Sequence, residues 1–183
     1  MARDGPSFSD PHFDYEHDIL KNLPGFADQK KLDKFERIET AKAILNLQSS
    51  PVKGRFDATH IRQIHFRIFK NVFPWAGEFR QVNMRRSSSC GFAVVRFLGK
   101  NLDSTFAKLA AENHLKGLDA EAFAGRAAYY LGELNSIHPF REGNGRTHAS
   151  LFDSWLLRPA TASTGFALLA SRWLTHLSKV TIW

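Results

Sequence analysis

The stretch HPFREGNGR at residues 138–146 determines how this 183-residue chain can fold. The residues before it, at about 119–137, repeat apolar side chains at helical spacing, and Pro139 stops that helix. The residues from Asn144 onward can begin another helix. We therefore predict a helix–loop–helix turn with the stretch in its loop, a position where binding and catalytic residues are common.

The small residues Gly143, Asn144 and Gly145 predict an anion site. At the start of a helix they let backbone N–H groups converge on a phosphate, and the helix dipole adds a favourable potential. Arg146 adds a forked guanidinium that suits the outer phosphates of a nucleotide. A surface salt bridge is the alternative role for this arginine.

Two further side chains of the same stretch predict chemistry. Glu142 places a carboxylate beside the phosphates, which is repulsive unless a divalent cation lies between them, so Mg²⁺ is implied. His138 titrates near neutral pH and can take the proton of a hydroxyl that attacks phosphorus. Phe140, which lies between them, is expected to anchor the loop in the core.

The remainder of the chain predicts one mostly α-helical domain. Residues 1–27 are rich in Pro, Gly, Asp and His and predict a loop-rich entry segment that docks on the core. His60 and His65 are expected to be packing or surface histidines. Alternation between Trp75 and Leu98 predicts a short β-hairpin. Apolar spacing predicts helices over about 28–47, 57–73, 101–115 and 119–137.

The charge and composition limit the partners. A net charge of +7 and a pI near 9.8 suit an anionic ligand, but the basic residues are scattered, which disfavours nucleic acid. Cys90 is the only cysteine, so no internal disulfide can form. No apolar run approaches the roughly 20 residues of a membrane span, and the first residues lack a signal-peptide layout. These features predict a cytoplasmic protein without a membrane partner, with export by another signal as the alternative.

Residues 138–146 resemble the signature of the Fic family, HxFx(D/E)GNGRxxR. Upstream, IHFRIFKNVFPWAGEFRQVNM at 64–84 is similar to a helix of that family and the hairpin that follows it. Residues 15–28, YEHDILKNLPGFAD, resemble the family's entry segment. The likeness covers nearly all of residues 11–148.

The resemblance implies a Fic-type helical bundle with a core over 28–148, and a protein adenylyltransferase activity that moves AMP from ATP to a Tyr, Ser or Thr hydroxyl of a target protein. His138 would be the general base, Glu142 the metal ligand, residues 143–145 the phosphate nest and Arg146 the triphosphate contact. A hairpin flap at about 77–97 would align the target chain. Its residues by resemblance are Gly77, Glu78, Phe79, Arg80, Phe92 and Ala93.

Family members that resemble phosphotransferases carry lysine at the position of Gly145, so glycine here favours AMP transfer. Two alternatives stay open on the same scaffold. One is phosphate transfer or another nucleotidyl transfer, and the other is an inactive domain that only binds nucleotide.

The sequence departs from the family signature after Thr147. Ala149 stands where the signature has its second arginine, which predicts weaker placement of the triphosphate. Residues 149–183 show no clear helical stripe and no family-like continuation, whereas a reading frame shifted after the Thr147 codon permits a family-like string. We therefore treat this tail as the hypothetical product of a frameshift.

A self-inhibitory motif of the form (S/T)xxxE(G/N) is also missing from the sequence. Glu112 and Asn113 supply its end, but Lys108 stands where Ser or Thr belongs. This predicts that inhibition, if the family pattern holds, comes from a separate small antitoxin-like partner.

Overall fold

The computed structural model describes residues 9–87 and 91–156 of the chain. Its helices confirm the prediction of a mostly α-helical fold, and its strands form one small antiparallel sheet. The elements in chain order are β1 (Phe13–Asp14), β2 (Ile19–Leu20), α1 (Gln29–Ser49), α2 (Ala58–Phe69), α3 (Leu98–Ala111), α4 (Ala120–Ile137) and α5 (Asn144–Leu156), with short 3-10 turns at Val95–Phe97 and Asn113–Leu115.

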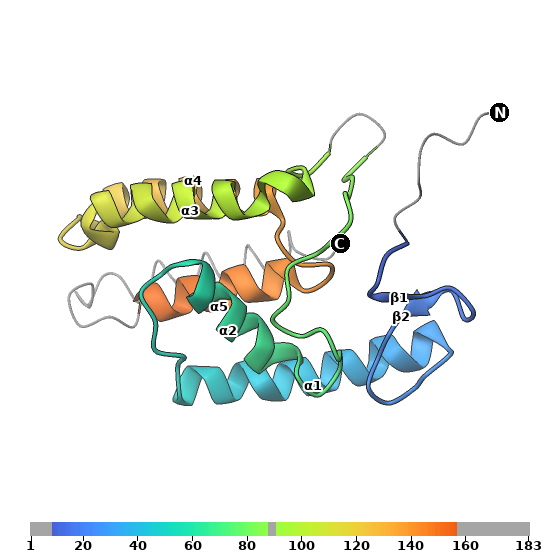
Figure 1. Ribbon diagram of the computed structural model, residues 1–183. Coiled ribbons are helices and arrows are strands. Elements are labelled where there is room, and N and C mark those ends of the chain that lie inside the picture. Colours follow the sequence, from blue (N-terminus) through green and yellow to red (C-terminus); the bar gives the residue numbers. More distant parts are fainter. Residues whose placement is uncertain (1–8, 88–90, 157–183) are drawn as a thin grey trace.

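The helices lie in three layers (Figure 1). Helix α1 forms one outer layer, α3 and α4 form the other, and α2 and α5 run between them. Helix α2 therefore touches α1, α3 and α5, and it carries its buried side chains at helical spacing: Ile61, Ile64, Ile68 and Phe69. No described helix is both long and apolar enough to cross a membrane.

Three helices begin with the same type of cap. Asp28, Asp57 and Asp119 each accept a hydrogen bond, 2.8 Å long, from a backbone N–H in the first turn of α1, α2 and α4. Such a cap satisfies an N–H group that has no intrahelical acceptor, and it stabilises a helix by about 1 kcal/mol. The caps explain why these helices begin within one residue of the predicted positions.

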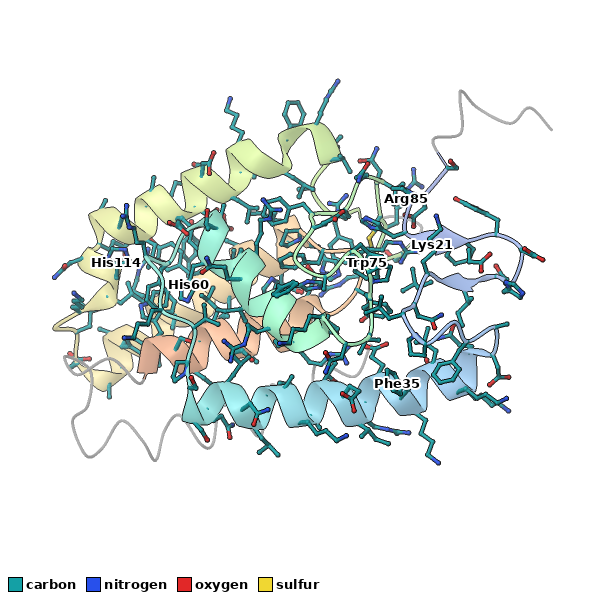
Figure 2. The ribbon with its side chains drawn as sticks, turned by 60° about the horizontal axis from the view of Figure 1, so that its bottom comes forward. Lys21, Phe35, His60, Trp75, Arg85 and His114 are labelled. Atoms are coloured by element: carbon teal, nitrogen blue, oxygen red, sulfur yellow. The ribbon has the colours of Figure 1, made fainter. Side chains whose placement is uncertain are left out.

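The entry segment docks on the core, as predicted. Ile19 of β2 is 1% exposed, and the N–H of Leu23 donates to the carbonyl of Val72. The indole N–H of Trp75 donates to the backbone carbonyl of Lys21 at 3.2 Å, and the two residues lie side by side in Figure 2. The segment thus adds buried apolar area to a core that is already rich in aromatic rings.

The strands are not where the alternating pattern placed them. Within its described part, the flap (residues 77–97) contains a single antiparallel bridge, between Arg85 and Gly91, and the two-stranded sheet lies in the entry segment. Residues 95–97 form a 3-10 turn that leads into α3 rather than a strand. The reason is that the carbonyls of Val82 and Ala93 accept hydrogen bonds from the Arg80 side chain, which replaces strand pairing there.

Helix α5 continues well past Thr147. Leu151, Phe152 and Trp155 are 2%, 5% and 2% exposed, so the expectation that no helical stripe follows Thr147 is wrong for residues 148–156. Residues 157–183 of the predicted tail lie outside the described residues. Whether a frameshift produced the tail stays a prediction.

We expect Trp155→Ala to lower the free energy of unfolding by about 3–5 kcal/mol, because it empties a large buried volume. The Trp155 ring stacks on Phe56, and its indole N–H donates to the carbonyl of His114 at 2.8 Å. Leu45→Ala is the matched control, since Leu45 is 64% exposed and its loss should cost less than about 0.5 kcal/mol. Urea unfolding measures both, and equal small effects would show that α5 is dispensable beyond Thr147.

Candidate active site

His138 ends helix α4 in a left-handed conformation, with φ 52° and ψ 64°. Its N–H donates to the carbonyl of Leu134 at 2.9 Å, which closes the last turn of the helix. The imidazole stacks on Phe92 with ring centroids 3.8 Å apart and planes 14° apart. Phe92, in the later part of the flap (residues 91–97), therefore covers one face of the predicted base.

The electrostatic surroundings of His138 keep its imidazole neutral. Burial is the main cause that lowers its pKa to about 4, and the charges of Arg80 and Arg86 lower it further, while the Asn135 backbone carbonyl acts in the opposite sense. At neutral pH the ring is thus in the form that can accept a proton.

The loop after His138 is closed by the side chain of Asn144. Its Oδ1 accepts from the N–H of Phe140 at 2.9 Å, and its Nδ2 donates to the carbonyl of the same residue at 2.8 Å. Phe140 is fully buried and stacks on His65 at 3.9 Å, so it anchors the loop as expected. These two bonds use both ends of the Asn144 side-chain amide. The group that Asn144 can offer to a ligand is therefore its backbone N–H.

Helix α5 begins at the same loop with N–H groups that have no acceptor among the described residues. The first helical hydrogen bond runs from the N–H of Thr147 to the carbonyl of Gly143, so the N–H groups of Asn144, Gly145 and Arg146 precede it. Gly143 has φ +81°, and a Cβ there would lie 2.1 Å from the ring of Phe69. Glycine is required at this position for both reasons, and the close approach brings the helix start onto the core.

Arg146 is held in place by four groups. Its Nη2 pairs with the carboxylate of Glu36 from α1 and lies 3.3 Å from Glu142 Oε1, and its Nη1 donates to Thr40 Oγ1 at 3.2 Å. The guanidinium also lies over the ring of Phe69, 4.8 Å from the centroid. This geometry leaves Nε–H and one Nη1 hydrogen without an acceptor in the described part of the chain, and these can face an anion.

Sequence reasoning missed Glu36 and gave His65 no role beyond packing or surface exposure. Burial raises the pKa of Glu36, and the charge of Arg146 opposes that shift. His65 accepts from the N–H of Gly77 through Nδ1 at 2.8 Å, so its Nε2–H donates to the carbonyl of Glu142 at 3.1 Å. It is a packing histidine, as expected, but it also ties the start of the flap to the loop. Glu36 and His65 each lie one helical turn from buried residues of their helix. This spacing indicates a side that faces the core, but it could not reveal a hydrogen-bond partner far away in the chain.

The predicted flap residues divide into two groups. Glu78 is exposed and lies 3.7 Å from His12 of the entry segment, and Phe79 is half-buried against Phe140. Gly77 and Arg80 are buried, Arg80 to 2% exposure, and the Arg80 side chain is occupied by backbone carbonyls. Docking of a target chain on the flap stays a prediction. The backbone N–H of Ala93 donates to Ser136, which fastens the flap to α4.

The entry segment also reaches the motif. Asp10 Oδ2 accepts from Arg141 Nε at 2.5 Å, and the Asp10 side chain is only 9% exposed. This ion pair thus holds the loop against the entry segment. Because Arg141 is already paired with a carboxylate, it is not a free cation.

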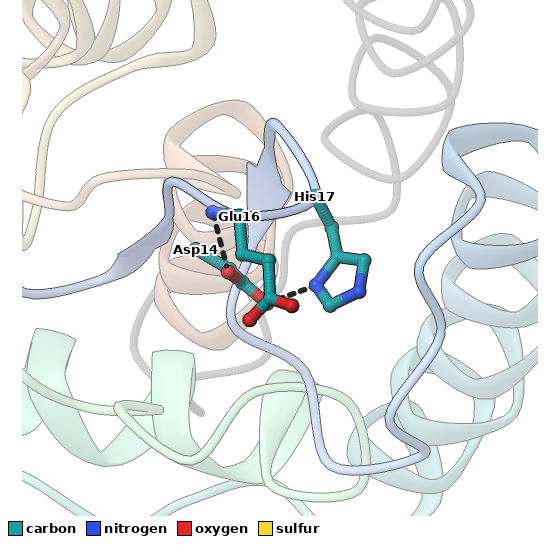
Figure 3. A group of neighbouring side chains, drawn as sticks. All are labelled: Asp14, Glu16 and His17. Carbon is teal, nitrogen blue, oxygen red and sulfur yellow. Dashed lines mark hydrogen bonds and ion pairs between the residues drawn. The ribbon is translucent and has the colours of Figure 1, made fainter.

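A second group of titratable side chains lies at the turn between β1 and β2 (Figure 3). Asp14 Oδ1 accepts from the N–H of Glu16 and Asp14 Oδ2 from His17 Nδ1, at 3.0 and 2.9 Å. The bond to His17 is the main cause that lowers the pKa of Asp14 and raises that of His17. These contacts close a surface turn, and the group is separate from the candidate active site.

The helical bundle thus has a neutral histidine at the end of α4 and an anchored arginine in the first turn of α5, on the two sides of one short loop. Residues 55–156 match the Fic/DOC family. The chain belongs to this family, whose match extends nine residues beyond Thr147.

Known relatives share the sequence and the fold. The chain is 42% identical over 142 residues to the protein adenylyltransferase VbhT of Bartonella schoenbuchensis, a match that covers 76% of this chain and 29% of VbhT. It is 31% identical over 147 residues to the probable protein adenylyltransferase Fic of Escherichia coli K12, covering 79% of this chain and 70% of that protein. The chain thus spans less than a third of the length of VbhT.

A solved structure shows the same fold with a nucleotide. BepC of Bartonella tribocorum, a VirB-translocated effector, was solved with bound AMPPNP, and it superimposes with a TM-score of 0.72 at 27% identity. The match covers 90% of this chain and 85% of that structure.

Acid should destabilise the folded chain through the buried His65 and His148 and the half-buried His138. Burial is the main cause that lowers the pKa of His65 to about 3, of His138 to about 4 and of His148 to about 3, from 6.5. Below pH 6.5 the unfolded chain binds protons that the folded chain excludes, so stability falls with pH at about 1.4 kcal/mol per unit for each histidine until the folded pKa is reached. His148→Gln should make the fall between pH 6 and 4.5 shallower in urea unfolding. An unchanged slope would contradict the burial of this ring.

Gly143→Ala should lower the free energy of unfolding by about 2–4 kcal/mol, because it combines a positive φ with a clash against Phe69. Gly132→Ala is the control, since an added Cβ there meets nothing within 4 Å and alanine favours the helix. Thermal unfolding of both variants measures the difference. A Gly143→Ala protein as stable as the control would show that the loop does not require this glycine.

Proposed function

We propose that this chain is a protein adenylyltransferase that moves AMP from ATP to a hydroxyl side chain of a target protein. The observation that carries the proposal is the short loop that joins the neutral imidazole of His138, at the end of α4, to the N-terminus of α5 and the anchored guanidinium of Arg146. The names of the relatives, protein adenylyltransferases of several bacteria, support the same reaction.

In the proposed reaction, the oxygen of a target Tyr, Ser or Thr attacks the α-phosphorus of ATP. His138 accepts the hydroxyl proton, and because its Nδ1 is buried, Nε2 is the nitrogen that we assign to this step. A bond forms between the target oxygen and the α-phosphorus, and the bond from that phosphorus to the bridging oxygen of the β-phosphate breaks. The products are the adenylylated target and pyrophosphate.

The start of α5 supplies the electrostatic part of this reaction. The N–H groups of Asn144, Gly145 and Arg146 are aligned with the helix dipole, which favours negative charge at this position. The remaining N–H groups of Arg146 extend the positive potential towards the outer phosphates. Because Glu36 and Thr40 hold the guanidinium before a nucleotide binds, little side-chain entropy is lost on binding.

The residues present fit a magnesium ion. Glu142 is 43% exposed, and a single carboxylate together with phosphate oxygens and water is a common ligand set for Mg²⁺. When bound, the ion would neutralise charge on the phosphates. The Glu142 carboxylate accepts from the N–H of Gly143 at 2.8 Å, which orients it at the mouth of the phosphate site.

One observation favours a second candidate, a domain that binds nucleotide with little turnover. Ala149 lies in the second turn of α5 where the family signature has an arginine, so this chain lacks a cation that the resemblance assigns to the triphosphate. The predictions of a separate inhibitory partner and of export both stay predictions.

ATP labelled at the α-phosphate should mark a protein in a bacterial or host lysate when this chain is added, and ATP labelled at the γ-phosphate should not. His138→Ala should reduce the α-label by at least about 100-fold, because proton abstraction contributes about 10²–10⁴ to such a rate. The matched control is His17→Ala, since His17 is exposed and distant from the motif.

Other outcomes of the same experiment separate the alternatives. Transfer of label from the γ-phosphate would show that the reaction is phosphate transfer and not AMP transfer. Binding of ATP in calorimetry without any label would favour the nucleotide-binding domain. Equal α-label from the wild-type chain and the His138→Ala variant would remove His138 from the reaction.

A further inference from the structure

Arg80 is the most fully hydrogen-bonded buried cation of the described chain. It is 2% exposed, and its guanidinium donates only to backbone carbonyls. Nε donates to His138 at 2.7 Å, Nη1 to Val82 at 2.7 Å, and Nη2 to Ile137 at 3.2 Å and to Ala93. Its own N–H donates to the carbonyl of Pro139 at 2.9 Å.

These contacts surround the residue proposed as the base. Arg80 binds the carbonyls of Ile137 and His138 and, through its backbone, that of Pro139, so it fixes three consecutive peptide groups of one turn. The same guanidinium donates to the carbonyls of Val82, in the earlier part of the flap, and Ala93, in its later part. We propose that Arg80 is a positioning residue that holds the left-handed turn at His138 and couples it to the flap.

The choice of arginine at this position has a physical reason. A buried charge is costly unless hydrogen bonds replace its water, and none of the described carboxylates pairs with Arg80. The planar guanidinium offers five N–H groups in a fixed fork, which can satisfy carbonyls on several sides at once. A lysine ammonium could reach one or two of these carbonyls but could not hold them in one plane.

The turn needs such support. His138 has φ 52°, a conformation that residues with a Cβ rarely adopt, and it persists only where the surroundings fix it. Phe92, next to Ala93, stacks on the imidazole, so the bond from Arg80 to Ala93 also fixes the ring contact. The position of the base and the position of the flap thus depend on the same side chain. The charge of Arg80 additionally lowers the pKa of His138.

The inference rests on the proposed AMP transfer for its kinetic test. In Arg80→Lys we expect kcat for α-label transfer to fall by roughly 10- to 100-fold, because a small misplacement of a catalytic group has this effect. The affinity for AMPPNP, measured by calorimetry, should change less than about twofold, since the phosphate-binding N–H groups belong to α5. Arg37→Lys is the matched control, because Arg37 is exposed on α1.

A second measurement uses the wild-type chain and needs neither activity nor a folded variant. In nuclear magnetic resonance, the Nε–H of Arg80 should exchange with solvent far more slowly than that of Arg37. It should also show a coupling across the hydrogen bond to the carbonyl carbon of His138. Failure of AMP transfer by the wild-type chain would end the proposed function and leave this measurement to decide the role of Arg80.

Three results would overturn the inference. The first is a folded Arg80→Lys protein with wild-type kcat. The second is a loss of kcat and AMPPNP affinity by the same factor, which would indicate general structural damage. The third, decisive if the variant does not fold, is an Arg80 Nε–H that exchanges as fast as that of Arg37.

Discussion

The two hydrogen bonds between the Asn144 side chain and the backbone of Phe140 close the loop on which the site depends. They close the loop between the end of α4, which His138 caps, and the start of α5, so the predicted base and the first turn of α5 are joined by one short, fixed segment. The close contact of Gly143 with Phe69 then places this loop against α2. Contact with helix α2 of the core thus supports the short motif and keeps its reactive groups in place.

Much of the loop support is aromatic and neutral. The rings of His65, Phe140 and Phe79 pack in succession beneath the loop, and His65 also bonds Gly77 and Glu142. A charged side chain in this layer would change the potential at the phosphate site. Neutral rings leave that potential to Arg146, Glu142 and the dipole of α5, which are the groups that a nucleotide would meet.

The sequence predicted the helices well because their signals are local. Aspartate caps and apolar spacing lie within one turn, so α1, α2 and α4 begin where Asp28, Asp57 and Asp119 indicate. The motif predicted the loop between α4 and α5 for the same reason. The structure of the flap was less predictable. The Arg80 side chain donates hydrogen bonds to flap carbonyls, and an alternating pattern of apolar residues cannot reveal such bonds. The pairing of Glu36 with Arg146 joins residues far apart in the chain, which no local pattern can encode.

The packing of α5 separates two requirements that are usually met together. Leu151, Phe152 and Trp155 hold the helix in the core through one face, while the groups that a nucleotide would contact lie in its first turn. Selection for folding therefore acts on different positions from selection for chemistry. A gene of this kind can therefore exchange the residue at position 149 and keep the core contacts of α5, so the abundance of the protein in a cell is no measure of its catalytic competence.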